Sequence, residues 1–131
     1  MILLDTDVCI EILRGNRNVI EKRKTESDVV AVSFITVAEL FYGSLKSVNS
    51  TKNNILVEKF LLSIDIIQSD YEISKKFGEL KANLEINGNV IADADLFIAS
   101  TAITKCSKLI TGNVKHFDRI TNLHVENWIR N

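Results

Sequence analysis

The stretch Ala92-Asp93-Ala94-Asp95-Leu96-Phe97-Ile98-Ala99-Ser100-Thr101-Ala102 sets two carboxylates against a run of apolar and small residues. Apolar residues recur in it at helical spacing, so it predicts a helix that is largely buried. Asp93 is a plausible N-cap, because the positive end of a helix accepts a negative charge. Asp95 lies inside the first turn beside residues that must be buried, and a buried carboxylate is costly without a cation or hydrogen-bond donors. The sequence therefore indicates that other groups converge on Asp95.

Length and composition predict a single domain, spanning residues 1–131, that is large enough to bury a core. Of the 131 residues, 46% are hydrophobic, and the net charge is −1. This near-neutral balance does not point to a nucleic-acid partner, although it can conceal a local basic patch. The sequence shows neither a signal peptide nor an apolar run of transmembrane length, so we expect a cytoplasmic protein with no membrane association.

The cysteines and histidines argue against chemistry based on these residue types. Cys9 and Cys106 fall at apolar helical positions, which favours two reduced, packed thiols over a disulfide or a metal site. His116 and His124 are isolated in the sequence. A zinc site or a histidine-based triad is therefore disfavoured.

Short apolar runs alternate with amphipathic segments along the chain. The strand candidates are residues 2–4, 29–33, 64–67 and 108–111, with an edge strand within 125–129. The helix candidates include 17–26, 34–43 and a long stripe that follows an N-cap at Asp70, whereas polar residues 47–54 are expected to form a loop. This alternation predicts right-handed crossovers and an α/β fold with a central, mainly parallel sheet of four or five strands flanked by helices.

The carboxyl ends of parallel strands form one edge of such a sheet, and ligand sites lie there. Asp5 closes the first strand, Glu39 lies on the helix that follows the second, and Asp95 begins a later helix. Ser33, Thr36 and Glu39 are spaced three apart, which places them on one polar stripe of an otherwise apolar helix and turns Glu39 inward. A solvated position for Glu39 is the competing interpretation.

Several carboxylates at one sheet edge repel each other at neutral pH, and a divalent cation resolves this repulsion. Mg²⁺ and Mn²⁺ prefer oxygen ligands from a few carboxylates and retain water molecules that can attack a phosphate. Such an ion lowers the pKa of its water and stabilises charge on the phosphoryl oxygens, and a second ion can stabilise the leaving oxygen. The acid cluster therefore favours a nuclease over a zinc hydrolase.

At these residues the chain resembles the PIN-domain ribonucleases, and among them the VapC toxins of bacterial type II toxin–antitoxin pairs. Four segments carry the resemblance, in the order that the family shows: Leu3-Leu4-Asp5-Thr6-Asp7, Ser33-Phe34-Ile35-Thr36-Val37-Ala38-Glu39-Leu40, Asp95-Leu96-Phe97-Ile98-Ala99 and Leu109-Ile110-Thr111-Gly112-Asn113-Val114-Lys115-His116-Phe117. The resemblance implies a PIN-like three-layer fold and a toxin that cleaves RNA with Mg²⁺, for which Mn²⁺ can substitute. It also implies a homodimer and a VapB-type antitoxin whose C-terminal segment covers the active site.

The resemblance assigns roles residue by residue. It makes Asp5, Glu39 and Asp95 the catalytic, metal-binding carboxylates. Thr6 and Thr111 are the nearby hydroxyl donors that help to hold the ion.

The chain departs from the family pattern at one position. Many members have a fourth acid where this chain has Asn113, while Asp93 is an additional acid two residues before Asp95. The number of ions, one or two, is therefore open. We expect Asn113 beside the ion, and Asp93 either to bind the ion in place of the missing acid or to cap the helix.

Two other interpretations are open to test. Leu4-Asp5-Thr6-Asp7-Val8 also fits the opening motif of haloacid dehalogenase-like phosphohydrolases, whose first Asp is a covalent nucleophile. Leu109-Ile110-Thr111-Gly112 resembles the second motif of that family, but only residues 113–131 follow it, which leaves no room for the Lys and the acid pair that such an enzyme requires. A catalytically degenerate, protein-binding PIN-like domain is the other alternative, but it would be expected to lose acids from the cluster.

Contacts to RNA and to the antitoxin are expected around the predicted site. The candidate basic residues are Arg14, Arg17, Lys22 to Lys24, Lys115 and Arg119. For Lys22 to Lys24, a solvated helix face is the favoured interpretation. The RNA target is open between transfer RNA and a ribosomal RNA loop. An antitoxin tail is expected to pair a basic residue with the acids and to bind beside Ile10, Leu13, Phe41 and Tyr42.

Overall fold

The computed structural model of the protein describes residues 1–130 and contains a five-stranded sheet in the order β3-β2-β1-β4-β5. Every neighbouring pair of strands is parallel, so the predicted α/β class with a mainly parallel sheet is confirmed. The strands are β1 (Ile2–Leu4), β2 (Val30–Ser33), β3 (Asp65–Ile67), β4 (Leu109–Ile110) and β5 (Val125–Glu126). The helices are α1 (Thr6–Leu13), α2 (Arg17–Thr25), α3 (Phe34–Leu45), α4 (Ser50–Leu62), α5 (Tyr71–Ile86), α6 (Asp93–Lys105) and α7 (Val114–Phe117).

Polar side chains mark where several helices begin. Asp70 caps α5 as predicted, because its Oδ1 accepts a hydrogen bond from Ile73 N at 2.9 Å. Ser33 ends β2 and caps α3 in the same way, through Ile35 N. The loop predicted for residues 47–54 is wrong in its second half, where α4 begins at Ser50.

Alternate residues of each strand face opposite sides of the sheet, and this alternation divides the apolar core into two parts. On one face, Leu3 of β1 packs in a buried cluster with Leu96 of α6. On the other face, Leu4 of β1 packs with Val8 of α1. Both faces of the sheet are thereby covered, as a parallel sheet requires.

Within residues 1–130, none of the helices combines the length and apolar character needed to cross a membrane.

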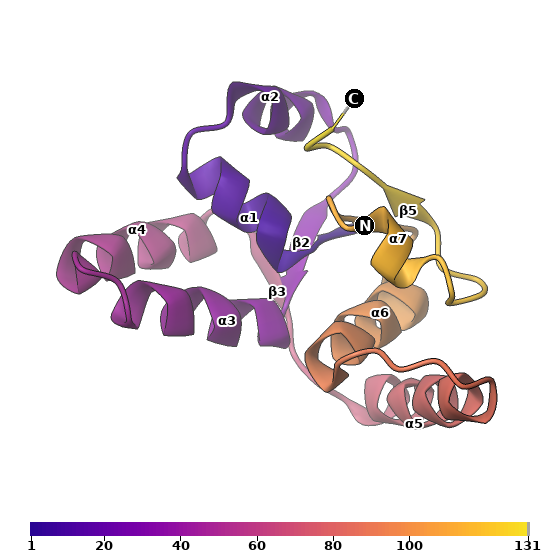
Figure 1. The fold of residues 1–131 in the computed structure, drawn as a ribbon. Helices are drawn as coiled ribbons and strands as arrows, with labels where there is room; N and C mark the ends of the chain where they lie inside the picture. Colours follow the sequence, from indigo (N-terminus) through magenta and orange to yellow (C-terminus); the bar gives the residue numbers. More distant parts are fainter. Residues whose placement is uncertain (131) are drawn as a thin grey trace.

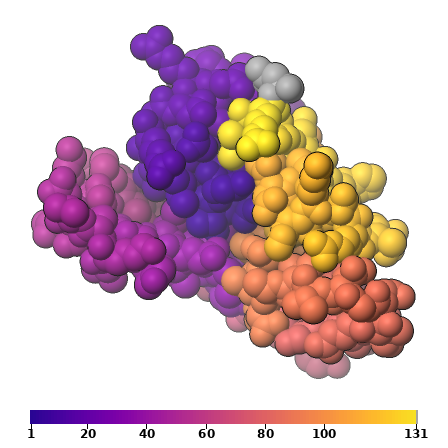
Figure 2. Space-filling view, in the orientation of Figure 1, coloured from indigo at the N-terminus to yellow at the C-terminus, as the bar shows by residue number. Residues whose placement is uncertain are grey.

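The helices form two layers around the sheet. Residues from α1 to α4 contribute to one core cluster, and residues from α5 to α7 contribute to the other (Figure 1). Helices α3 and α4 pack against each other as a hairpin that projects from the rest of the molecule, at the left of Figures 1 and 2. The predicted three-layer arrangement is therefore present.

The sheet changes its direction of winding beside its central strand. The strands β2 and β3 follow β1 on one side, whereas β4 and β5 lie on the other. The carboxyl ends of β1 and β4 therefore form the topological switch point, where open α/β sheets bind ligands. Asp5 N donates to Ile110 O at 2.8 Å across this point, which fixes the residues after both strands side by side.

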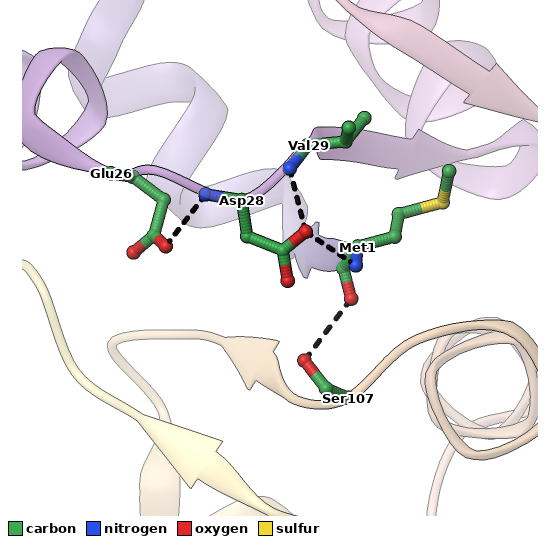
Figure 3. Close-up of polar contacts among 5 residues, drawn as sticks. All are labelled: Met1, Glu26, Asp28, Val29 and Ser107. Atoms are coloured by element: carbon green, nitrogen blue, oxygen red, sulfur yellow. Dashed lines mark hydrogen bonds and ion pairs between the residues drawn. The ribbon is translucent and has the colours of Figure 1, made fainter.

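Polar contacts tie the strands together at the opposite edge, where the strands begin (Figure 3). The Met1 nitrogen lies 2.7 Å from Asp28 Oδ1, which also accepts from Val29 N at 2.7 Å. Asp28 N donates to Glu26 Oε1 at 3.1 Å, and Ser107 Oγ donates to Met1 O at 3.2 Å. These contacts link the starts of β1, β2 and β4, so this edge has a structural role.

The turn between β4 and α7 is tightly packed at Gly112. A Cβ there would lie 2.7 Å from Ile129 Cδ1 and 3.0 Å from Asp7 Oδ2.

We expect Gly112→Ala to lower the free energy of unfolding by about 1 to 3 kcal/mol, because these groups have to move. Gly78, in α5, is the matched control: a Cβ there would meet nothing within 4 Å. Gly78→Ala should therefore raise the free energy of unfolding by about 0.5 to 1 kcal/mol. Urea unfolding measures both, and effects of the same sign would contradict this description of the turn.

Candidate active site

Asp5 is a buried carboxylate at the switch point of the sheet. It directly follows β1 and is 7% exposed. Its Oδ1 accepts from Thr6 N at 2.8 Å, which caps α1, and its Oδ2 accepts from Thr111 Oγ1 at 2.8 Å. Burial raises the pKa of Asp5 to about 7, and the nearby charge of Asp7 adds to this effect, while the two hydrogen bonds oppose it. The hydrogen bonds of Asp5 therefore compensate only part of the cost of burying its negative charge.

Glu39 reaches the same region from α3 through two threonines. Thr6 Oγ1 donates to Glu39 Oε1 at 2.7 Å and lies 2.9 Å from Thr36 Oγ1. Because Thr6 has one hydroxyl proton and gives it to Glu39, the Thr36 hydroxyl must donate to Thr6. Thr36 is fully buried and Glu39 is partly buried, so the polar stripe on this helix faces inward as predicted.

Asp7 is a second acid of the β1–α1 junction that the sequence interpretation did not single out. Its Oδ2 accepts from Gly112 N at 2.9 Å, whereas its Oδ1 is buried without a hydrogen-bond partner. Burial raises the pKa of Asp7, and the charge of Asp95 raises it further. Its position two residues after Asp5 was the available signal, but an acid in the first turn of a helix also has an ordinary structural explanation.

Asp95 meets His116, which the sequence interpretation set aside as isolated. Asp95 lies in the first turn of α6, and its Oδ2 is 2.8 Å from His116 Nε2 of α7. This distance is that of an ion pair, yet the ring nitrogen is not aligned for a hydrogen bond and is buried without a hydrogen-bond partner. The two side chains are 30% and 29% exposed, so the pair lies at the margin of the site. Asp95 therefore has a close partner, although that partner is His116 and not one of the predicted acids, whose convergence on Asp95 stays a prediction.

Asp93 and Asn113, the two residues considered for the fourth ligand, have different surroundings. Ala92 rather than Asp93 is the N-cap residue of α6, and no side-chain bond caps this helix, so the capping role predicted for Asp93 is wrong. Asp93 Oδ1 instead accepts from Lys81 Nζ at 2.9 Å, and its side chain is 61% exposed. Asn113 is exposed, and its backbone N donates to Thr111 Oγ1 at 3.0 Å. A metal-binding role for Asp93 stays a prediction, which its contacts do not support.

The donor atoms at this edge suit a hard divalent cation in their chemistry. They are mainly carboxylate oxygens, two of the carboxyl groups have raised pKa values, and Asp7 Oδ1 lacks a donor. In residues 1–130, no group of three or more His, Cys, Asp or Glu side chains is already close enough to hold one ion. The hydroxyls of Thr6 and Thr111 hold Glu39 and Asp5 in separate hydrogen bonds. Shared ligation of an ion therefore requires these side chains to turn towards each other.

A cavity of about 300 Å³ lies between α1 and the α3–α4 hairpin, next to the acids. Ile10 and Leu13 line it as predicted for an apolar groove, and Glu39 also belongs to its lining. Phe41 packs against the core and Tyr42 is 66% exposed, and neither lines the cavity, so a contact of these two residues with an antitoxin stays a prediction. The cavity joins an apolar surface to a carboxylate of the candidate site.

The basic residues expected to contact RNA have different surroundings. Arg14 lines the same cavity, and its side chain is 74% exposed. Arg23 Nη2 donates to Ser63 O at 2.9 Å, and its guanidinium lies 5.4 Å from the centre of the Phe60 ring. Arg23 therefore fastens α2 to the end of α4, which gives this one residue a structural role in place of the predicted solvated position.

Comparisons with known proteins place this arrangement in a family. Residues 2–123 match the model of the PIN domain. Ribonuclease VapC2 of Rickettsia felis is 36% identical over 133 residues, which cover 96% of each protein. The tRNA(fMet)-specific endonuclease VapC of Salmonella typhimurium is 28% identical over 127 residues, again 96% of each.

A comparison with solved structures agrees. The crystal structure of VapBC2 from Rickettsia felis, bound to a DNA fragment from its promoter, contains a chain that superimposes with a TM-score of 0.92. The two chains are 35% identical, and the match covers 98% of this chain and 99% of the other. The chain therefore belongs to the PIN domain family and, within that family, to the VapC proteins.

Proposed function

We propose that the chain is a divalent-metal-dependent endoribonuclease and the toxin of a VapBC-type toxin–antitoxin pair. The observation that carries this proposal is the gathering of Asp5, Glu39 and Asp95, with Asp7, at the switch point of the sheet. The names of the two relatives, both nucleases, support the activity. Membership of the PIN domain family removes the haloacid dehalogenase-like alternative. The intact acid cluster argues against a degenerate, purely protein-binding domain.

Asp5, Glu39 and Asp95 are the residues that would hold the ion, and Asp7 would supply a fourth carboxylate. A bound Mg²⁺ or Mn²⁺ supplies a water of lowered pKa and a positive charge opposite the phosphoryl oxygens. The chain's own part is to position the acids: Thr111 Oγ1 orients Asp5 at 2.8 Å, and Thr6 Oγ1 orients Glu39 at 2.7 Å.

The name of a relative and the charge around the site support a proposal for the substrate class. The Salmonella typhimurium relative is named as a tRNA(fMet)-specific endonuclease, which makes a structured RNA such as transfer RNA the first substrate to test and a ribosomal RNA loop the second. Arg14 beside the cavity, and Lys115 and Arg119 in and after α7, can contact phosphates near the acids. Such contacts would position the RNA without reading its bases.

The partner proposal rests on the complex of the relative and on the cavity. The Rickettsia felis chain was solved as part of VapBC2, which supports a VapB-type antitoxin here. A segment of the antitoxin would place apolar side chains on Ile10 and Leu13 and a basic side chain near Glu39. We also propose that the toxin forms a homodimer and acts in the cytoplasm, where RNA and the antitoxin are available.

The first test of the proposed function is the dependence of RNA cleavage on metal. EDTA should abolish cleavage of transfer RNA, and Mg²⁺ or Mn²⁺ should restore it. Asp5→Asn, Glu39→Gln and Asp95→Asn should each reduce the cleavage rate by about 100-fold or more, because each would weaken a ligand of the ion. Circular dichroism of each variant controls for folding. Full cleavage in EDTA would overturn the metal mechanism, and full cleavage by one variant would remove that residue from the site.

A second test compares two acids that could replace the one missing at Asn113. Asp7→Asn should weaken Mn²⁺ binding by roughly tenfold or more, because its buried Oδ1 is free to bind an ion. Asp93→Asn is the matched control, since Asp93 is paired with Lys81 on the surface and should leave Mn²⁺ binding unchanged. Isothermal titration with Mn²⁺ measures both. The opposite ranking would assign the fourth carboxylate to Asp93.

A third test uses the pH dependence of stability in the metal-free protein. The pKa of Asp5 is about 7 in the folded chain, whereas the ordinary pKa of an aspartate is 3.8, so between these values the folded protein holds a proton that the unfolded chain has lost. Stability should therefore fall as the pH rises from about 4 to about 7, by at most about 4 kcal/mol for this group.

Asp5→Asn should reduce this slope to the part that Asp7 contributes, whose pKa burial also raises. The variant should be more stable than the wild type at neutral pH, because a buried charge is lost while the helix cap is kept. Urea unfolding in EDTA at about pH 5 and about pH 8 measures both proteins. A wild-type slope that persists unchanged in the variant would show that Asp5 is not its source.

A further inference from the structure

The side chain of His116 points at the acid cluster from the short helix α7. Its backbone N donates to Asn113 O at 3.1 Å, and its ring meets the Phe117 ring edge to face, with centroids 5.4 Å apart. Phe117 is 1% exposed and belongs to the core. The helix is thus anchored by Phe117, and the imidazole has a defined position beside Asp95.

The contact between His116 and Asp95 is close, but it is not a hydrogen bond. Nε2 lies 2.8 Å from Asp95 Oδ2, but the pair lacks the alignment of a hydrogen bond, and the nitrogen is shielded from solvent. In residues 1–130, the buried side-chain atoms without a hydrogen-bond partner are this nitrogen and Asp7 Oδ1, and both lie near the acids. A buried polar atom that makes no hydrogen bond costs free energy, and a bound ion would give both of these atoms a favourable contact.

The separation of these atoms suits two neighbouring ligands of one ion. Ligand atoms about 2.1 Å from an ion and at right angles to each other lie about 3 Å apart. The 2.8 Å between His116 Nε2 and Asp95 Oδ2 is close to that value. Imidazole nitrogen suits transition metals such as Zn²⁺, Fe²⁺ and Ni²⁺, whereas Mg²⁺ takes oxygen ligands. Mn²⁺ also prefers oxygen, but as a transition metal it accepts a nitrogen ligand more readily than Mg²⁺ does.

We propose that His116 Nε2 is a nitrogen ligand of the ion held by Asp95, and that this ligand makes the site prefer Mn²⁺ or a similar transition metal over Mg²⁺. The inference rests on the proposed metal-dependent function and specifies which ion that function uses. It assigns His116 to the site, although sequence spacing gives no indication of it.

The chain offers a matched control, because its two histidines are His116 and His124. His124 is exposed, precedes β5 and accepts from Leu109 N through its backbone oxygen. It lines a hollow with Ile2 and Lys108 at the edge where the strands begin, opposite the acids. His124→Gln therefore removes a histidine without touching the candidate site.

The direct test is pulsed electron paramagnetic resonance of Mn²⁺ bound to the protein, prepared without a histidine tag. Wild type and His124→Gln should show the modulation from a coordinated histidine nitrogen, and His116→Gln should lose it. Competition titrations should show that His116→Gln lowers the affinity for Mn²⁺ relative to that for Mg²⁺ by roughly tenfold or more. Circular dichroism establishes that the variants are folded.

Bound Mn²⁺ without nitrogen modulation in the wild type would overturn the inference, and this result does not depend on any variant folding. Modulation that persists in His116→Gln, or an unchanged preference between the two ions, would also overturn it. These outcomes are distinct from failure of the proposed function, which is the absence of metal-dependent RNA cleavage. A protein that cleaves RNA with Mn²⁺ but shows no nitrogen ligand keeps the function and loses this role for His116.

Discussion

The hydrogen bond between Thr111 Oγ1 and Asp5 Oδ2 is the interaction on which the arrangement of the site depends. It joins the residue after the central strand β1 to the residue after β4, across the switch point of the sheet. The other oxygen of Asp5 caps α1, so one carboxylate fixes both a strand junction and the start of a helix. The Asp5 carboxylate is poorly solvated in this position, and these hydrogen bonds offset only part of the cost of burying its charge.

Most of the fold follows from the sequence because its strands and helices have distinct patterns. Three or four β-branched and apolar residues in a row suffice to predict β1 and β2, and an N-cap such as Asp70 fixes where a long helix begins. The rule that parallel strands gather their sites at the carboxyl edge then brings Asp5 and Glu39 together. The spacing of three on α3 correctly turns Glu39 inward, where Thr6 meets it.

The rest of the site could not be predicted because it depends on tertiary contacts. Asp7 looks like an ordinary acid in the first turn of a helix, and only the packing of the β4–α7 turn shows that one of its oxygens is buried. His116 lies on a helix too short to have a periodic pattern, so nothing in the sequence directs it to Asp95. Asp93 is the reverse case. Its place in the sequence suggests a helix cap or a metal ligand, and only the folded structure shows that it pairs with Lys81 of α5.

The long separation between the parts of the site has a consequence for the order in which the protein is made. Thr111 lies 106 positions after its partner Asp5, and His116 follows still later. While a ribosome is still synthesising the middle of the chain, β1 has β2 as a neighbour but not β4, and the Asp5 carboxylate has no hydroxyl from Thr111. A nascent chain therefore lacks an assembled acid cluster until β4 and α7 have emerged and docked. The proposed nuclease activity would therefore begin only when translation of the chain is almost complete, so each new molecule would be inactive while it is being made.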